Sequence, residues 1–384
     1  MIEEKKKPMI PLSLPHLDGN EWKYVKDCLD TGWVSSAGAY VTQFEQMVAD
    51  FAGVKYGIAC VNGTSGLHLT MHMHDVKLGD RLLVPNITFI ASANAASYIF
   101  ADPIFVDVDP QTWQMDLDLL ENFLENDCET RDELTYEKGT DKPIKAIMPV
   151  HVLGNMCDMP RLVEICGKHH IVIIEDASES LGSYYNGKHS GGFGKMSVFS
   201  FNGNKIITTG GGGVIVTDDE ALAKRCKHLT TQAKSDPNTY YHDEIGFNYR
   251  LVNILAAVGV AQMEQLPDFI LKKKAMDAYY REHLNGVGDI RFQKVEKEVD
   301  PNCWLFTFSS TRQAEILQKL QAEKVIARPF WMPMNQLPMF TEKRYVSKKD
   351  HSRKVHAESL SIPSSVNLEE AQMAEVVRII KACF

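Results

Sequence analysis

Seven short apolar segments alternate with helical stretches over the first 220 residues, and this alternation most constrains the fold. The strand candidates are 56–62, 81–86, 103–109, 144–151, 171–178, 196–202 and 213–219. Helical segments such as 66–76 and 158–170 separate most of them. Nearly all-apolar strands alternating with helices predict an α/β fold with a mostly parallel sheet covered on both faces. The last two strands are too close for a helical crossover, so we expect them to pair antiparallel.

The pattern changes after residue 220, where long helical segments are followed by a smaller α+β region. Helices are predicted over 218–232, 253–285 and 312–325, and a strand over 302–310. We therefore expect a large domain over residues 1–250, including an N-terminal arm, and a small C-terminal domain over 251–384. The acidic stretch 121–143 is predicted to be a solvated surface excursion.

The net charge limits the partners that we expect, and the cysteines bear on the cellular location. The formal net charge of −9 at pH 7 disfavours nucleic acid or an anionic membrane as the main partner. No run approaches the roughly 20 apolar residues of a membrane span, and the N-terminus lacks a signal-peptide core. Eight scattered cysteines without a CxxC pair indicate reduced thiols. These features predict a cytoplasmic location.

The residues just beyond the strand ends are the candidates for a site, because ligands of open α/β sheets bind at the carboxyl ends of the strands. These segments are 62–65, 85–89, 176–180 and 200–205, together with His151, which we interpret as structural. They hold an acid, an aromatic ring, several small hydroxyl residues and a lysine. They hold no cluster with metal-ligand spacing, so no metal is expected.

The segment "CVNGTSGLHL" predicts a strand, a glycine turn and a helix opened by Thr64 and Ser65. The free N–H groups of a helix N-terminus can bind a phosphate, but the same residues also serve as a simple helix cap. The segment matches neither the dinucleotide fingerprint nor the Walker motif. From this segment by itself, both interpretations stay open, a phosphate site and a helix cap.

Two further segments each allow more than one reading. Asp176, after Glu175 in "VIIEDASES", fits a helix cap, a metal ligand or a partner for a protonated ring nitrogen. Lys205, in "SFNGNKIITTGGGG", fits an exposed hairpin or a lysine that forms a Schiff base, with Ser200 as a phosphate ligand nearby. Taken together, the predicted phosphate site, the acid, the lysine and the aromatic ring of Phe89 are the groups that would bind pyridoxal 5'-phosphate.

In its sequence motifs the chain resembles the DegT-type nucleotide-sugar aminotransferases, which have the type I aspartate aminotransferase fold. The resemblance covers about residues 10 to 340. The motifs that carry it are "DTGWVSSAGAYVTQFE", "NGTSGLHL", "PNITFIASANA", "PVHVLGN", "EDASESLGS", "SFNGNKIITTGGGG", "GFNYRLVNILAAVGVAQ" and "ARPFWMPMNQLPMF". Within the family the chain looks most like the branch of the legionaminate and bacillosamine pathways.

The resemblance implies the roles of the residues around the cofactor. Lys205 would bond the cofactor covalently and move the proton during catalysis. Asp176 would pair with the pyridine nitrogen, and Phe89 would cover the ring. Glu179 would lie near the phenolic oxygen, where many family members carry Gln and some carry Glu.

The resemblance also implies a phosphate site shared between two subunits. Thr64, Ser65 and Ser200 would bind the phosphate from one chain. Asn248, in "GFNYR", would reach it from the neighbouring subunit, which makes the working unit a homodimer.

The expected substrate is a UDP-4-keto-6-deoxy-N-acetylhexosamine, aminated at C4 with glutamate as the donor, for surface polysaccharide or glycan synthesis. Trp33, Ser35 and Asn335 are the substrate-binding candidates, although the family more often has His in place of Asn335. The alternatives are the same reaction on a GDP- or dTDP-linked keto sugar, or a non-catalytic regulator on the same fold. A sugar 3-dehydratase would carry histidine in place of Lys205.

Overall fold

The computed structural model describes residues 8–236 and 238–384, so the first seven residues of the predicted N-terminal arm lie outside the described residues. All seven predicted strands are present in one sheet of ten strands. They are β1 Tyr56–Cys60, β2 Arg81–Pro85, β3 Asp102–Val106, β6 Pro143–Ile147, β7 Val172–Asp176, β10 Met196–Ser200 and β11 Gly213–Thr217.

The order along this sheet is β1-β11-β10-β7-β6-β2-β3-β16, where β16 is Tyr345–Val346. The strands from β10 to β16 pair parallel. The predicted antiparallel pairing of β10 with β11 is confirmed, and β1 also pairs antiparallel with β11. The C-terminal β16 was not predicted, because a two-residue strand has no detectable period in the sequence.

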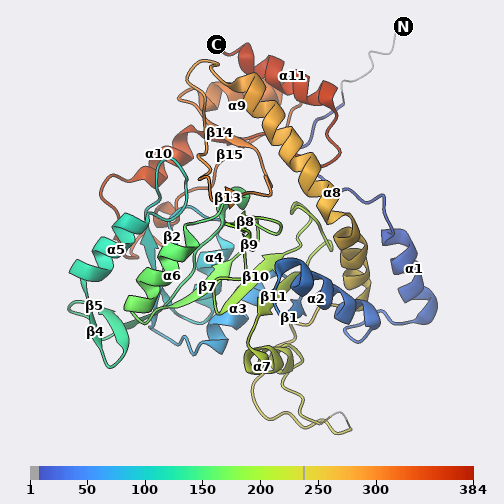
Figure 1. The fold of residues 1–384 in the computed structure, drawn as a ribbon, viewed down its shortest axis with the longest axis vertical. Coiled ribbons are helices and arrows are strands. Elements are labelled where there is room, and N and C mark those ends of the chain that lie inside the picture. The colour runs from blue at the N-terminus through green and yellow to red at the C-terminus, as the bar shows by residue number, and fades with distance from the viewer. Residues whose placement is uncertain (1–7, 237) are drawn as a thin grey trace.

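Helices cover both faces of the sheet, as the apolar strands predicted (Figure 1). On β11, Ile215 points into one apolar cluster, and its neighbours Val214 and Val216 point into another on the opposite face. The helices that build the large part of the molecule are α1 Glu21–Thr31, α2 Ala39–Ala52, α3 Gly63–Met73, α4 Ala91–Tyr98, α5 Leu117–Asn126, α6 Met159–Lys168 and α7 Glu220–Thr230. Burial on both faces is what stabilises a parallel sheet.

The acidic stretch 121–143 is more ordered than predicted. It contains the end of α5 and a hairpin of β4 Cys128–Arg131 and β5 Leu134–Glu137, and β5 pairs with β6. Most of β4 is exposed, which explains the hydrophilic sequence, but Glu137 of β5 binds Arg81 and Arg344. The prediction of a solvated surface excursion therefore holds for β4 but not for β5, whose Glu137 contacts residues that are distant in the sequence.

Helix α8, Asn253–Leu284, joins the two parts of the chain (Figure 1). Its first half contributes Val260 and Leu266 to the apolar cluster that contains Val214 and Val216 of β11. Its second half contributes Tyr280 and Leu284 to an apolar cluster of the C-terminal part. Among the described residues it alone has the length and apolar composition of a membrane span, and half of its most apolar stretch is buried within the protein. This is weak evidence for a span. The domain boundary near residue 250 stays a prediction.

The C-terminal part contains a small antiparallel sheet in the order β12-β14-β17-β15. Its strands are β12 Arg291–Phe292, β14 Thr307–Ser309, β15 Arg328–Pro329 and β17 Ser359–Ser361, and its helices are α9 Gln313–Ala322, α10 His351–Glu358 and α11 Glu370–Lys381. The strand predicted over 302–310 is only β14, because residues 302–305 form an irregular segment, with Cys303 at φ +54°, that bonds to loops of the large part. A third small sheet joins β8 Tyr184–Tyr185, β9 Lys188–His189 and β13 Val299–Asp300.

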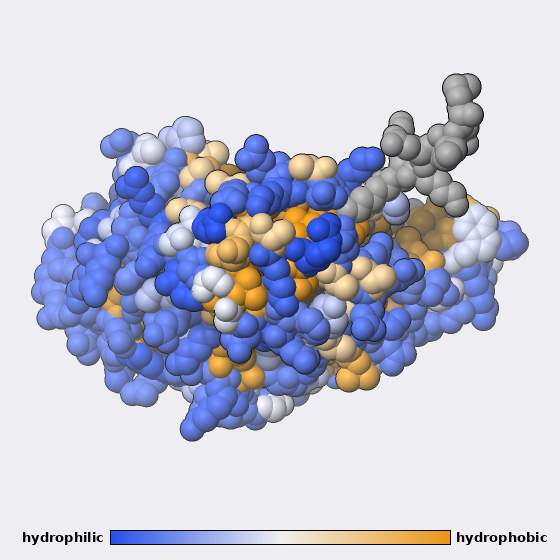
Figure 2. All heavy atoms as spheres, turned by 90° about the horizontal axis from the view of Figure 1, so that it is seen from above, coloured by the Kyte–Doolittle hydropathy of each residue, from blue (hydrophilic) through white to orange (hydrophobic). Residues whose placement is uncertain are grey.

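The surface and the cysteines agree with the composition. Figure 2 shows the molecule from above, where hydrophilic side chains cover most of the face and apolar side chains gather near its middle. All eight cysteines are free thiols, and all but one are buried.

Candidate active site

One cavity of about 540 Å³ lies between the carboxyl ends of the sheet strands and the C-terminal part of the chain. Its volume is in the range of small-molecule sites. The large part contributes six of the predicted site residues, which are Thr64, Phe89, Asp176, Glu179, Ser200 and Lys205. The C-terminal part contributes Trp304, Leu305, Arg328, Phe330 and Trp331, of which none was predicted as a site residue.

Lys205 is held inside this cavity and is not an exposed hairpin lysine. Its side chain is 11% exposed, and its Nζ lies 3.2 Å from Oε1 of Glu179. The same Nζ lies over the ring of Trp304, 4.1 Å from the ring centroid. The turn after β10 places it there, with the Lys205 N–H donating to the carbonyl of Asn202 at 3.0 Å.

Glu179 is the acid beside this lysine, and 4% of its side chain is exposed. Burial raises the pKa of Glu179 above its usual range, and the opposing pull of the Lys205 ammonium and of the Leu153 N–H only reduces the shift. The Leu153 N–H donates to Oε2 at 2.9 Å from a left-handed backbone conformation, φ +63°. Non-glycine residues rarely adopt this conformation, and such strain often accompanies functional sites.

Asp176 ends strand β7 at the cavity, with 4% of the residue exposed. Its Oδ2 accepts from Ser92 Oγ at 2.7 Å, and its Oδ1 accepts from the Ser178 N–H at 3.2 Å. Two donors fix the orientation of the carboxylate and leave part of its accepting capacity for a ligand, since an ionised carboxylate has about four lone-pair positions. Ser92 was missed as a supporting residue, although it lies in the "PNITFIASANA" motif.

The start of α3 forms a cradle with two serine hydroxyls. Asn62 caps the helix by accepting from the Ser65 N–H at 2.8 Å, so α3 begins at Gly63 and Thr64 and Ser65 lie within its first turn. A Cβ on Gly63 would lie 3.0 Å from Cβ of Ser200 and 3.4 Å from Oγ of Ser178, so glycine keeps this space open. A helix N-terminus beside two hydroxyls suits a phosphate, and these residues fit the phosphate of pyridoxal phosphate. Ser178 was not predicted, and Ser65 is not among the lining residues.

Four other predicted site residues do not line the cavity of their own chain, although all four are described. Trp33 is 59% exposed, and Ser35 accepts at its backbone carbonyl from the Asn253 N–H. Asn248 forms a β-bridge with Thr231. The remaining one, Asn335, accepts at Oδ1 from Asn86 Nδ2 at 2.9 Å and donates its backbone N–H to Oδ1 of the same residue at 3.0 Å.

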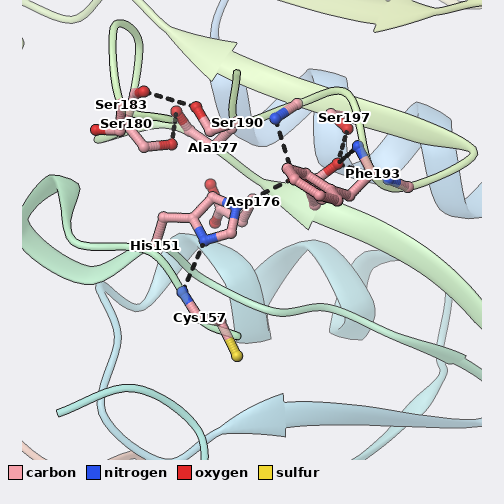
Figure 3. Close-up of polar contacts among 12 residues, drawn as sticks. His151, Cys157, Asp176, Ala177, Ser180, Ser183, Ser190, Phe193 and Ser197 are labelled. Carbon is pink, nitrogen blue, oxygen red and sulfur yellow. Dashed lines mark hydrogen bonds and ion pairs between the residues drawn. The ribbon is translucent and has the colours of Figure 1, made fainter. Parts of the chain in front are cut away.

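The neighbour of Asp176 on β7 points to the opposite face and has a different environment. Glu175 is fully buried and accepts five hydrogen bonds, from His151, Ser197 and three backbone N–H groups between 191 and 194. Figure 3 labels three of the residues that bond to it, His151, Phe193 and Ser197. Burial by itself raises the pKa of Glu175, but the bonds from His151 and the backbone outweigh it and hold the pKa below its usual range.

His151 is therefore part of a sealed network, which agrees with its interpretation as structural. Its Nε2 lies 3.0 Å from Glu175, and its Nδ1 accepts from the Cys157 N–H at 3.5 Å (Figure 3). This pattern corresponds to the neutral tautomer that carries its proton on Nε2.

Comparison with known proteins identifies the class. Residues 15–381 match the family model described as the DegT/DnrJ/EryC1/StrS aminotransferase family, and the chain belongs to this family. The protein is thus a pyridoxal phosphate-dependent sugar aminotransferase with the fold that the sequence predicted.

Individual relatives span nearly the whole chain. A GDP-perosamine synthase of Escherichia coli O157:H7 is 39% identical over 368 residues, 95% of each chain. A putative pyridoxal phosphate-dependent aminotransferase, EpsN of Bacillus subtilis, is 35% identical over 98% of this chain and 96% of its own. Among solved structures, DesV of S. venezuelae superposes with a TM-score of 0.86 at 26% identity, over 95% of this chain and 94% of its own.

Proposed function

We propose that the protein transfers an amino group from glutamate to C4 of a nucleotide-linked 4-keto-6-deoxyhexose. The observation that carries the proposal is the convergence of Lys205, Asp176, Glu179 and the α3 cradle on one cavity. A cytoplasmic reaction for surface polysaccharide or glycan synthesis remains part of this proposal.

The cofactor-binding residues are assigned by their fit to its groups. The N-terminus of α3 with Thr64, Ser178 and Ser200 would hold the phosphate. Asp176, oriented by Ser92, would keep the pyridine nitrogen protonated, and the exposed ring of Phe89 would cover one face. Pyridoxal phosphate, when bound, supplies the electron sink that stabilises negative charge at the substrate carbon.

Lys205 is the group in the cavity suited to move the proton. Its amine, when free, can take a proton from the substrate carbon of the amino donor and later deliver one to the sugar carbon. Glu179, 3.2 Å away, can hold the ammonium within each half-reaction, while the lysine carries a proton. The walls contributed by the C-terminal part, which include Trp304 and Trp331, exclude water from this proton transfer.

The nucleotide carrier is the finer part of the proposal. The resemblance in motifs favours a UDP-4-keto-6-deoxy-N-acetylhexosamine. Three relatives, 33 to 39% identical, are named GDP-perosamine synthases, which favours a GDP-linked substrate. A UDP-N-acetyl-3-dehydro-alpha-D-glucosamine 3-aminotransferase, 29% identical, shows that the family also contains proteins named for UDP sugars. We therefore propose a GDP-linked keto sugar as the first candidate substrate.

Turnover with matched GDP-, UDP- and dTDP-linked 4-keto-6-deoxyhexoses and glutamate tests this proposal. We expect the GDP substrate to give the highest kcat/KM and NMR of the product to show nitrogen at C4. Preference for the UDP-linked acetylhexosamine would restore the first expectation. A relative 30% identical is named a pleiotropic regulatory protein, so absence of turnover with every sugar would favour the non-catalytic alternative.

We further propose that two chains share each site. Asn248, Trp33 and Ser35 do not line the cavity of their own chain, as expected if they serve the site of a neighbour. Mixing inactive Lys205→Ala with inactive Asn248→Ala chains should restore activity, because one site of each heterodimer would contain both intact residues. Heterodimers without activity would show that each site is built within one chain.

A further inference from the structure

An aromatic ring from the C-terminal part packs directly on the predicted catalytic lysine. Trp304 is 2% exposed, and its ring centroid lies 4.1 Å from Nζ of Lys205. An ammonium over an indole face is attracted by the ring quadrupole, and tryptophan is the strongest partner for this interaction. A neutral amine lacks the charge that this attraction needs. The ring therefore favours the charged form of the lysine and fixes its place.

The indole is held rigidly, so its position is part of the fold. Its Nε1 donates to the carbonyl of Asn204, the residue before the lysine, at 2.8 Å. Its backbone N–H donates to Oδ1 of Asn302 at 3.0 Å, and its carbonyl accepts from Nζ of Lys273 at 2.9 Å. Lys273 is fully buried on α8 and also donates to the carbonyl of Ser364.

The same segment also bonds to the backbone of the acid that contacts the lysine. Asn302 Nδ2 donates to the backbone carbonyl of Glu179 at 2.8 Å and to that of Leu181 at 2.9 Å. Gly154 makes this close approach possible, because a Cβ there would collide with the Asn302 side chain. Residues 302–304 thus supply the ring that packs on Lys205 and hold the backbone of the acid that contacts it.

We propose that Trp304 is a positioning residue that holds the amino group of Lys205, in its ammonium form, against Glu179 whenever that amino group is not bonded to the cofactor. The proposal rests on the proposed function in that it concerns the lysine assigned there to proton transfer. The charged groups lining the cavity around Lys205 are Glu179, Asp176 and Arg328, and the first two also favour the ammonium.

The first test measures the pH dependence of labelling of Lys205 in the cofactor-free, full-length protein. Trinitrobenzenesulfonate reacts with the neutral amine, and mass spectrometry of the peptide that contains Lys205 gives the labelled fraction. We expect Trp304→Leu to shift the labelling midpoint down by about half to one pH unit, because the ammonium loses its aromatic partner. Trp304→Phe keeps a ring and should shift the midpoint less.

A matched control separates this effect from a loss of packing. Phe269 belongs to the same buried cluster, and Phe269→Leu should lower the melting temperature without moving the midpoint. If Trp304→Leu does not fold, Lys273→Met removes the bond to the Trp304 carbonyl and should shift the midpoint in the same direction. An unchanged midpoint in the folded Trp304 and Lys273 variants would overturn the proposal.

The second test uses the loaded enzyme with glutamate deuterated at its α-carbon. In Trp304→Leu we expect kcat to fall with little change in KM and the isotope effect on kcat to rise, because proton transfer by Lys205 becomes slower than the other steps. An equal loss with an unaltered isotope effect would show a structural role and contradict the proposal. The labelling result does not depend on the sugar substrate, so the failure of either proposal can be told from the failure of the other.

Discussion

Two adjacent carboxylates on β7 lie in opposite environments, and the contrast distinguishes a structural acid from a chemical one. Glu175 is sealed in the interior and accepts five hydrogen bonds, so its accepting capacity is used within the protein. Asp176 is nearly as buried, but it accepts only two bonds and borders the cavity. Because side chains alternate along a strand, one residue step moves a carboxylate from the sealed network to the site. Burial by itself therefore does not identify the functional acid, whereas unused bonding capacity at a cavity does.

The largest expected effect is on the cavity side. Lys205→Ala should lower transamination by at least about a hundredfold, the typical contribution of a positioned acid–base group. The fold should survive, because the lysine lines a cavity, where its Nζ contacts Glu179 and the ring of Trp304. Steady-state kinetics and a melting curve measure both quantities. The control is Lys224→Ala, on an exposed face of α7, which should keep the full rate.

The two carboxylates should respond in opposite ways to the same chemical change. Glu175→Gln replaces one acceptor oxygen by an NH2 group that faces backbone donors, and should lower the free energy of unfolding by about 3 kcal/mol or more. Asp176→Asn should keep the protein stable but lose at least about tenfold in rate, because an amide does not hold the ring nitrogen protonated. Urea unfolding and kcat of the folded fraction measure the pair. A stable Glu175→Gln that has lost activity would break the distinction.

Lys273, on α8, is a buried base that can be compared with the two buried carboxylates. Burial lowers the pKa of Lys273 to about 7, whereas an unfolded lysine titrates near about 10.4. Between these values the unfolded chain binds a proton that the folded chain does not bind, so stability rises with pH across this window. Relative to Lys273→Met, the wild type should gain up to about 1.4 kcal/mol per pH unit from pH 7 to 10. Urea unfolding at each pH measures this difference in the free energy of unfolding. For Lys272→Met, on the exposed side of the same helix, the difference from the wild type should not change with pH.

The smallest expected effect concerns Glu179. Its raised pKa and its contact with Lys205 predict that Glu179→Gln stays active, because glutamine keeps a hydrogen bond and removes one negative charge. The pH midpoint of the cofactor's absorbance change should be equal to or lower than that of the wild type, since a nearby anion favours the protonated form. A midpoint that rises in the variant would place Glu179 on the substrate side of the site.

The sequence predicted those parts of the structure that depend on local pattern. The seven apolar strands and their helices have periods that are visible within ten residues, and the motifs around Thr64, Asp176 and Lys205 lie at strand ends. The hairpin over 128–137 was missed because its charged, mostly exposed residues hide the strand pattern, although its pairings are local. The two-residue β16 was missed because its partner strand β3 is distant in the chain. Trp304 was missed for the same reason. Its sequence context "NCWLF" reads as part of a strand, and only the folded chain brings it to Lys205.

The most direct test of the central claim is to locate the covalent bond to the cofactor. The protein loaded with pyridoxal phosphate should absorb near roughly 400–430 nm and bleach on treatment with borohydride. Digestion and mass spectrometry should then find the cofactor's mass on the peptide that contains Lys205 and on no other lysine peptide. A reduced adduct on another lysine, or no adduct with intact Lys205, would contradict the account.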